Sequence, residues 1–232
     1  FMAYYETPYP IQRRRNRIFA AIVGTLGVAL PAAGIWRYGF PDDVGLWLAF
    51  AIAYVGLEWY AVELNERLMT SPSSAVLVTA GIALGPSEAI GGLLAMAAIG
   101  FLQPRDLADR RVFEPLANLG NMSLGAAATA SILVMLLPDT VSDAGLLRVI
   151  GAGAAAAAVG DFITFAVTRT VVRQVFGSKL AGPWSNLRHI LLGFVGLGAM
   201  GGLLGYAYVQ YRVDQGVYNA MLWLAIATLL IS

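Results

Sequence analysis

The sequence predicts an all-α, polytopic membrane helix bundle, and three properties of the chain indicate this fold class. Hydrophobic side chains make up 58% of the 232 residues and charged side chains only 12%, about half the charged fraction of soluble domains. A chain so poor in charge cannot cover a water-facing surface. The apolar residues also gather in runs of about 20, the helix length that crosses roughly 30 Å of hydrocarbon. We expect the bundle to occupy residues 18–232, after a basic cytoplasmic arm at residues 1–17.

Six apolar runs are long enough to be full spans. The first is too long for the apolar core of a signal peptide and lacks a clear cleavage site, so we expect it to remain in the mature chain. The last run continues to the end of the sequence without a charged flank. We therefore expect a longer natural polypeptide with a cytoplasmic domain after Ser232. The predicted spans are Ile18–Trp36, Val44–Leu64, Leu116–Leu137, Leu146–Thr168, Ile190–Gln210 and Val217 to the end.

A seventh apolar segment, Ser73–Leu102, is interrupted near its middle by Gly85, Pro86 and Ser87. Each half holds about 13 to 16 residues, or roughly 20 to 24 Å of helix, which is short for a crossing. Positive side chains are retained on the cytoplasmic side. If the segment enters and returns as a helical hairpin, 12 of the 15 Lys and Arg residues lie on the side of the N-terminal arm. A single kinked helix would instead reverse every later span. We expect six full spans plus this hairpin, with both termini cytoplasmic in a bacterial inner membrane.

Composition also excludes several functions. The net charge of +1 argues against a nucleic-acid partner, and the absence of cysteine excludes disulfides, thiolate metal sites and thiol nucleophiles. The letters Gly196-Leu-Gly198-Ala-Met-Gly201 match a dinucleotide fingerprint, but they lie inside a span without a preceding strand or access for a phosphate. We expect no catalytic residues, no cofactor and no transition-metal site, and therefore no enzyme activity in these residues.

Small residues and basic residues have simpler expected roles. Glycines spaced by four let two membrane helices approach closely, so this face should pack within the bundle or against another protomer or subunit. The basic arm should orient the chain and contact anionic lipids. The helix-packing glycines are Gly198, Gly201, Gly202 and Gly205, and the lipid-facing arginines are Arg13, Arg14, Arg15 and Arg17.

Ionisable groups inside the hydrocarbon indicate where a functional site would lie, because each is costly unless paired, protonated or hydrated. Glu58 and Asp161 should lie at similar depth in the cytoplasmic half, near Asn118 and Asn121. Glu88 follows the turn of the hairpin, where a helix dipole favours negative charge. These five residues form a candidate pocket for a small ligand, a cation or a proton. Alternatively, Glu88 is a helix-start residue near the outer surface, and Glu58 and Asp161 are neutralised by hydrogen bonds to neighbouring Asn, Ser or Thr side chains.

Two segments resemble the N-terminal membrane region of bacterial signalling proteins, in which such a region precedes an HD-GYP phosphodiesterase, GGDEF cyclase or kinase domain. These segments are Ser74–Pro86, which contains Leu84-Gly85-Pro86, and Glu114–Ala126. The run Leu116-Ala117-Asn118-Leu119 departs from the family by lacking its aromatic residue. The resemblance covers roughly residues 72–232, implies a sensory or anchoring role, and transfers no catalytic residue. A weaker similarity is to substrate-binding subunits of energy-coupling-factor transporters.

Three functions remain open at this point. The first is a noncatalytic multi-pass module that passes a change of helix packing to a cytoplasmic output. The second is an accessory subunit of a larger membrane complex. The third is a small-solute transporter or substrate-binding membrane subunit, which would need a closed polar cavity. All three have membrane lipids and other membrane helices as partners.

Overall fold

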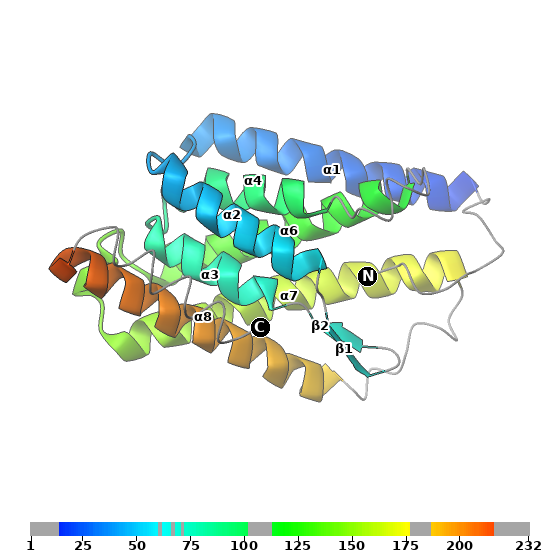
Figure 1. Cartoon of the computed structure of the whole chain (residues 1–232). Coiled ribbons are helices and arrows are strands. Elements are labelled where there is room, and N and C mark those ends of the chain that lie inside the picture. Colours follow the sequence, from blue (N-terminus) through cyan, green and yellow to red (C-terminus); the bar gives the residue numbers. More distant parts are fainter. Residues whose placement is uncertain are drawn as a thin grey trace.

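The computed structural model describes residues 14–59, 62–65, 68–70, 72–101, 113–176 and 187–215, and these ranges form one bundle of roughly parallel and antiparallel helices (Figure 1). One short antiparallel pair of strands interrupts the helices. The elements in chain order are α1 (Arg14–Tyr38), α2 (Val44–Trp59), β1 (Val62–Asn65), β2 (Leu68–Thr70), α3 (Ser73–Ala83), α4 (Ala89–Gly100), α6 (Phe113–Leu136), the 3-10 helix η1 (Val141–Asp143), α7 (Leu146–Phe176) and α8 (Leu187–Gln215).

Four of the described helices are long and apolar enough to cross a membrane. Their apolar parts are Ile18–Tyr38, Pro115–Leu136, Leu146–Thr170 and Ile190–Arg212, which correspond to four of the six predicted spans. These helices are apolar around much of their circumference. One side of each helix packs in the bundle, and the other side carries exposed apolar residues such as Ile22, Leu147 and Leu192. Such exposure of large apolar side chains is stable when the surrounding solvent is lipid.

The predicted second span, Val44–Leu64, is wrong in its length. Helix α2 ends at Trp59 after 16 residues, about 24 Å of helix. The following residues, Val62–Asn65, alternate apolar and polar side chains, which is the period of a strand, and they pair with Leu68–Thr70. The sixth predicted span, from Val217 onward, lies outside the described residues.

The broken apolar segment forms two antiparallel helices, α3 and α4, joined by a tight turn at Leu84–Glu88 (Figure 1). Gly85 has a φ of +90°, a left-handed conformation that glycine adopts without steric cost. The start of α3 and the end of α4 therefore lie at the same end of the bundle as the start of α1. The turn lies at the other end, where the Ser87 hydroxyl donates a hydrogen bond to Asp139 in the connection between α6 and α7.

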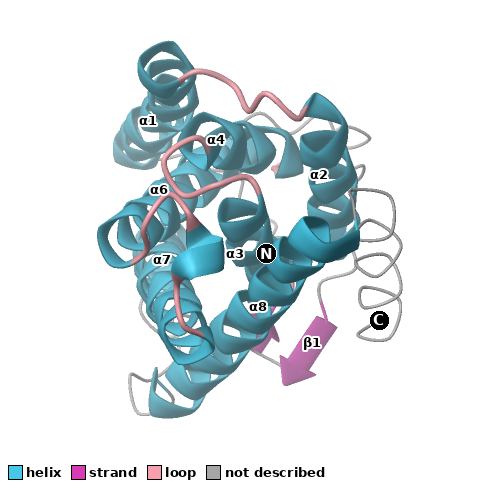
Figure 2. Ribbon diagram, turned by 90° about the vertical axis from the view of Figure 1, so that its left-hand side faces the viewer, coloured by secondary structure: helices cyan, strands magenta, loops and turns pink. Residues whose placement is uncertain are grey.

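Helix α3 is the centre of the bundle (Figure 2). It is surrounded by α2, α4, α6, α7 and α8, and each of its residues from Ser73 to Ala83, except Val76, is buried. Small residues make this possible, because α3 contains three alanines, a glycine and two serines among its 11 residues. Helix α1 packs outside this centre, against α4 and α6.

Candidate functional site

Glu58 in the last turn of α2 faces the first turn of α3. The Ser73 hydroxyl donates a hydrogen bond to Glu58 Oε1, and Ser73 is buried. The strand pair explains why these helix ends meet. Val62 is paired with Thr70, so the chain leaves α2 and returns to the same place before α3 begins.

Asp161 on α7 approaches the same turn of α3. The next serine, Ser74, is 8% exposed, and its hydroxyl interacts with the Asp161 carboxylate, although it makes no well-aligned hydrogen bond. Successive residues of a helix point about 100° apart, so Ser73 can face α2 while Ser74 faces α7. Glu58 and Asp161 therefore lie at one level of the bundle, within electrostatic range of each other.

Tyr54 completes this cluster, which we call the α3-start site: Glu58, Asp161, Ser73, Ser74 and Tyr54. Tyr54 is buried and lies within electrostatic range of both carboxylates. It precedes Glu58 by four residues, which places both side chains on one face of α2. Sequence reasoning missed Tyr54 and the two serines. The spacing of four was visible, but which helices flank the start of α3 was not.

Asn121 belongs to a separate contact. Its Nδ2 atom donates a hydrogen bond to Thr168 Oγ1 at 2.8 Å, and its Oδ1 atom is buried without a partner. Thr168 lies seven residues beyond Asp161 on α7, about 10 Å along the helix axis. Asn118, half-buried, lies one turn earlier on α6. The two asparagines thus lie on the neighbouring helix, nearer the end of the bundle where α6 begins.

Glu88 is not part of the pocket that the sequence predicted. It is exposed and occupies the position before Ala89 at the start of α4, where its side chain caps no backbone N–H group. The turn between α3 and α4 carries it to the end of the bundle opposite Glu58. Its position corresponds to the alternative that the sequence left open, a helix-start residue, because hairpin geometry separates residues at the turn from residues at its open end.

The four predicted packing glycines of α8, Gly198, Gly201, Gly202 and Gly205, face two different helices within the bundle. A Cβ atom at Gly202 would lie 2.8 Å from the Val149 carbonyl oxygen of α7, and one at Gly201 would lie 2.6 Å from the Ala75 carbonyl oxygen of α3. Gly198 likewise abuts α7, and Gly205 abuts Ile82 of α3. Because each site approaches backbone or a Cβ atom, α8 lies in direct contact with both helices.

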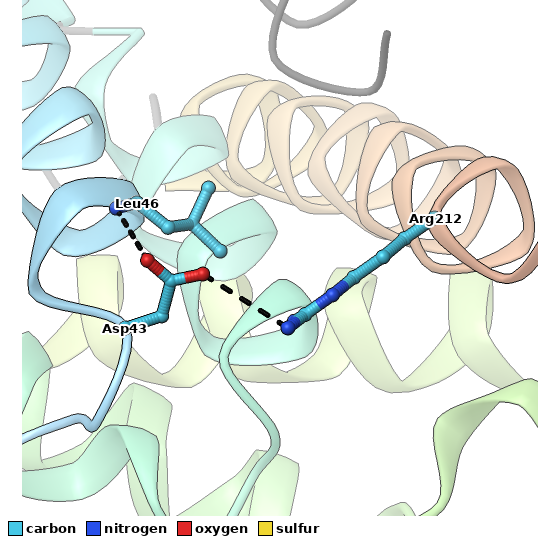
Figure 3. Close-up of polar contacts among 3 residues, drawn as sticks. All are labelled: Asp43, Leu46 and Arg212. Atoms are coloured by element: carbon cyan, nitrogen blue, oxygen red, sulfur yellow. Dashed lines mark hydrogen bonds and ion pairs between the residues drawn. The ribbon is translucent and has the colours of Figure 1, made fainter. Parts of the chain in front are cut away.

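The opposite end of the bundle has its own polar contacts (Figure 3). Asp43 Oδ1 accepts a hydrogen bond from the Leu46 backbone N–H at 3.0 Å, which caps the start of α2. Its other oxygen lies 3.9 Å from Arg212 Nη2 near the end of α8. Gln210 Nε2 donates to the Ser142 carbonyl oxygen of η1 at 3.1 Å. These contacts attach the end of α8 to two connections of the bundle.

The remaining predicted residues lie at the limits of the described chain. Arg13 is outside it. Arg14, Arg15 and Arg17 belong to the first turns of α1, but their side chains are outside the described part. Within the described ranges, no three His, Cys, Asp or Glu residues come together as metal ligands.

Comparison of the chain with models of known families, with curated proteins and with solved structures found no match.

Proposed function

We propose that this chain is a noncatalytic, multi-pass membrane module that acts as sensory input or membrane anchor for a cytoplasmic signalling output. The observation that carries this proposal is the position of α3. Its first turn contacts both acidic residues of the α3-start site, and its side facing α8 contacts the glycines Gly201 and Gly205. One central helix therefore joins a polar site to the last described helix.

This arrangement suits transmission of a change in packing. The Thr79 hydroxyl of α3 shares its single proton between the Ala75 carbonyl oxygen of its own helix at 2.7 Å and the Gly201 carbonyl oxygen of α8 at 3.1 Å, and no long side chain separates the two helices there. A shift of α3 would therefore press directly on the α8 backbone. Packed interfaces change between discrete arrangements and do not deform continuously. The α3-start site would favour one arrangement by binding it more tightly.

The two other functions have weaker support. For an accessory subunit, the glycine faces would be docking surfaces for another protein, but the four glycines predicted for this role, Gly198, Gly201, Gly202 and Gly205, are covered by α7 and α3 within this chain. For a solute carrier, the buried acidic residues are suitable groups. Those groups meet at the start of the most buried helix and line no described cavity, so we rank this function second.

The test perturbs the contact between α3 and α8 in the natural gene product. Gly201→Val should push α8 away from α3, whereas a Cβ atom at Gly196 meets nothing within 4 Å, so Gly196→Val is the matched control. We expect the Gly201 variant to remain in the membrane and to change second-messenger or phosphorylation output. Equal output from both variants, or a natural product that neither carries nor binds an output domain, would contradict the proposal.

A further inference from the structure

The first turn of α3 lies deep inside the apolar part of the bundle. Ala75 of α3 packs against Gly201 of α8, and the apolar part of α8 begins eleven residues earlier, at Ile190, which is about 16 Å along the helix. On α7, Asp161 faces the same turn of α3 and lies nine residues before Thr170, where the apolar part ends, which is about 14 Å. Both helices therefore place the start of α3 near the middle of a hydrocarbon core roughly 30 Å thick.

The chain that leads to this depth is not helical. Between α2 and α3 it forms the antiparallel strands β1 and β2, in which Val62 is paired with Thr70. Figure 1 shows this strand pair beyond the first turn of α3, toward the end of the bundle where α1 begins. Strand β1 has four residues and is about 13 Å long. The strand pair therefore fits within the half of the bundle that α3 does not reach.

Two-stranded sheets leave one edge of each strand without backbone partners. In hydrocarbon each unpaired N–H or C=O group costs several kcal/mol, so open sheet edges do not occur in contact with lipid. At membrane depth such backbone is found only where protein covers it or where it lines a water-filled cavity. Strand β1 also contains Glu63 and Asn65, residue types that are costly in the membrane unless they are paired or face water. The strand pair therefore requires surroundings other than lipid.

The two carboxylates beside the start of α3 favour water over a protein cover. Glu58 and Asp161 are half-buried and not closed off by packing. A partly exposed carboxylate at this depth contacts either lipid or water, and contact with lipid is the costly alternative. Water at the strand edges would satisfy the backbone of β1 and β2 and also hydrate both carboxylates. The first requirement comes from the backbone and the second from side chains of other helices, so the two are independent.

We propose that this half of the bundle holds a water-filled vestibule, bounded by the strand pair, the first turn of α3 and the part of α7 beyond Asp161. The vestibule opens at the end where α1 begins, which the distribution of Lys and Arg predicts to be cytoplasmic. It brings cytoplasmic water and small polar solutes to the α3-start site. Its existence follows from depth and backbone hydrogen bonding. Only its use, to present a cytoplasmic solute to a sensory module, rests on the function proposed above.

The experiment uses single cysteines in the full chain, which has no cysteine of its own. A charged, membrane-impermeant methanethiosulfonate reagent is added to intact cells or to inside-out membrane vesicles. A thiol reacts as its thiolate, so the reaction reports contact with water. Leu203→Cys is the matched control, because Leu203 is exposed on the surface of the bundle and lies two residues beyond Gly201, at the depth of the first turn of α3.

In inside-out vesicles, we expect Thr70→Cys and Asp161→Cys to react about 10-fold or more faster than Leu203→Cys, because neither a thiolate nor the charged reagent is stable in hydrocarbon. In intact cells the reagent should modify neither variant. Val62→Cys repeats the measurement on the other strand in case Thr70→Cys does not reach the membrane.

Three outcomes would overturn the proposal. Rates no faster than that of Leu203→Cys would show that protein or lipid covers the strand pair. Equally fast modification of Leu203→Cys would indicate a locally thinned bilayer instead of a vestibule. Faster modification in intact cells would place the opening at the opposite end. None of these measurements involves a signalling output, so the vestibule and the proposed function can fail independently.

Discussion

Replacing Gly153 of α7 by alanine places a methyl group where α7 and α8 touch. A Cβ atom there would lie 2.5 Å from the Gly198 carbonyl oxygen and 2.9 Å from the Gly202 Cα atom. Ordinary contact begins at 3.4 Å, so the helices must separate by about 0.9 Å. Both obstructing atoms belong to the α8 backbone, and no flexible side chain can move aside instead.

The magnitude follows from two opposing effects. A gap of 0.5–1 Å loses roughly a quarter to a half of each dispersion contact across the interface, and overpacking of this kind costs about 1–3 kcal/mol. Alanine is also a better helix former than glycine by about 1 kcal/mol. Gly151, two residues earlier on the same helix, is exposed and a Cβ atom there meets nothing within 4 Å. Gly151→Ala therefore receives the helix-propensity gain without the clash.

The difference between the two variants isolates the contact. We expect Gly153→Ala to be less stable than Gly151→Ala by about 1–3 kcal/mol. At roughly 2–4 °C per kcal/mol for a chain of this size, this corresponds to about 2–12 °C in the unfolding midpoint. The assay is size-exclusion chromatography of detergent samples after heating to a series of temperatures. If Gly153→Ala equals or exceeds Gly151→Ala in stability, the close approach of α7 and α8 described here is refuted.

Three further predictions concern the same fold. Asp43→Ala should lower the free energy of unfolding by about 0.5–2 kcal/mol, because the start of α2 loses its cap. Arg212→Ala should lower it by less than about 1 kcal/mol, because the ion pair is half-exposed, and equal losses from the two variants would contradict the capping role of Asp43. Thr79→Val, which removes the hydrogen bond to α8, should cost about 0.6 kcal/mol by the same heating assay, and a loss several times larger would contradict this estimate. Because the chain has no cysteine, single cysteines can report orientation: an impermeant maleimide on intact cells should label Glu88→Cys and not Pro72→Cys, and the reverse pattern would invert the proposed topology.

The sequence alone predicts only part of the candidate site. Glu58 and Asp161 stand out because charge is rare in apolar runs. Ser74 does not stand out, because serine is common in membrane helices and only its position against Asp161 makes it notable. Glu88 was grouped with the pocket because it is an ionisable residue in an apolar segment, and the direction of the hairpin separates it from Glu58 by the length of the bundle.

Hydrophobic run length and the Gly85-Pro86 break were enough to predict a helical bundle with one broken segment, because these depend on local composition and on backbone conformation at single residues. Run length predicted six full spans, and four of them are long apolar helices in the described part of the chain. Tertiary structure decided the rest. The length of α2 depended on strand pairing between Val62 and Thr70, a contact between separate segments. The choice of α3 as the central helix depended on which small-residue faces met, since glycine and alanine allow close packing with many partners and specify none of them until the helices assemble.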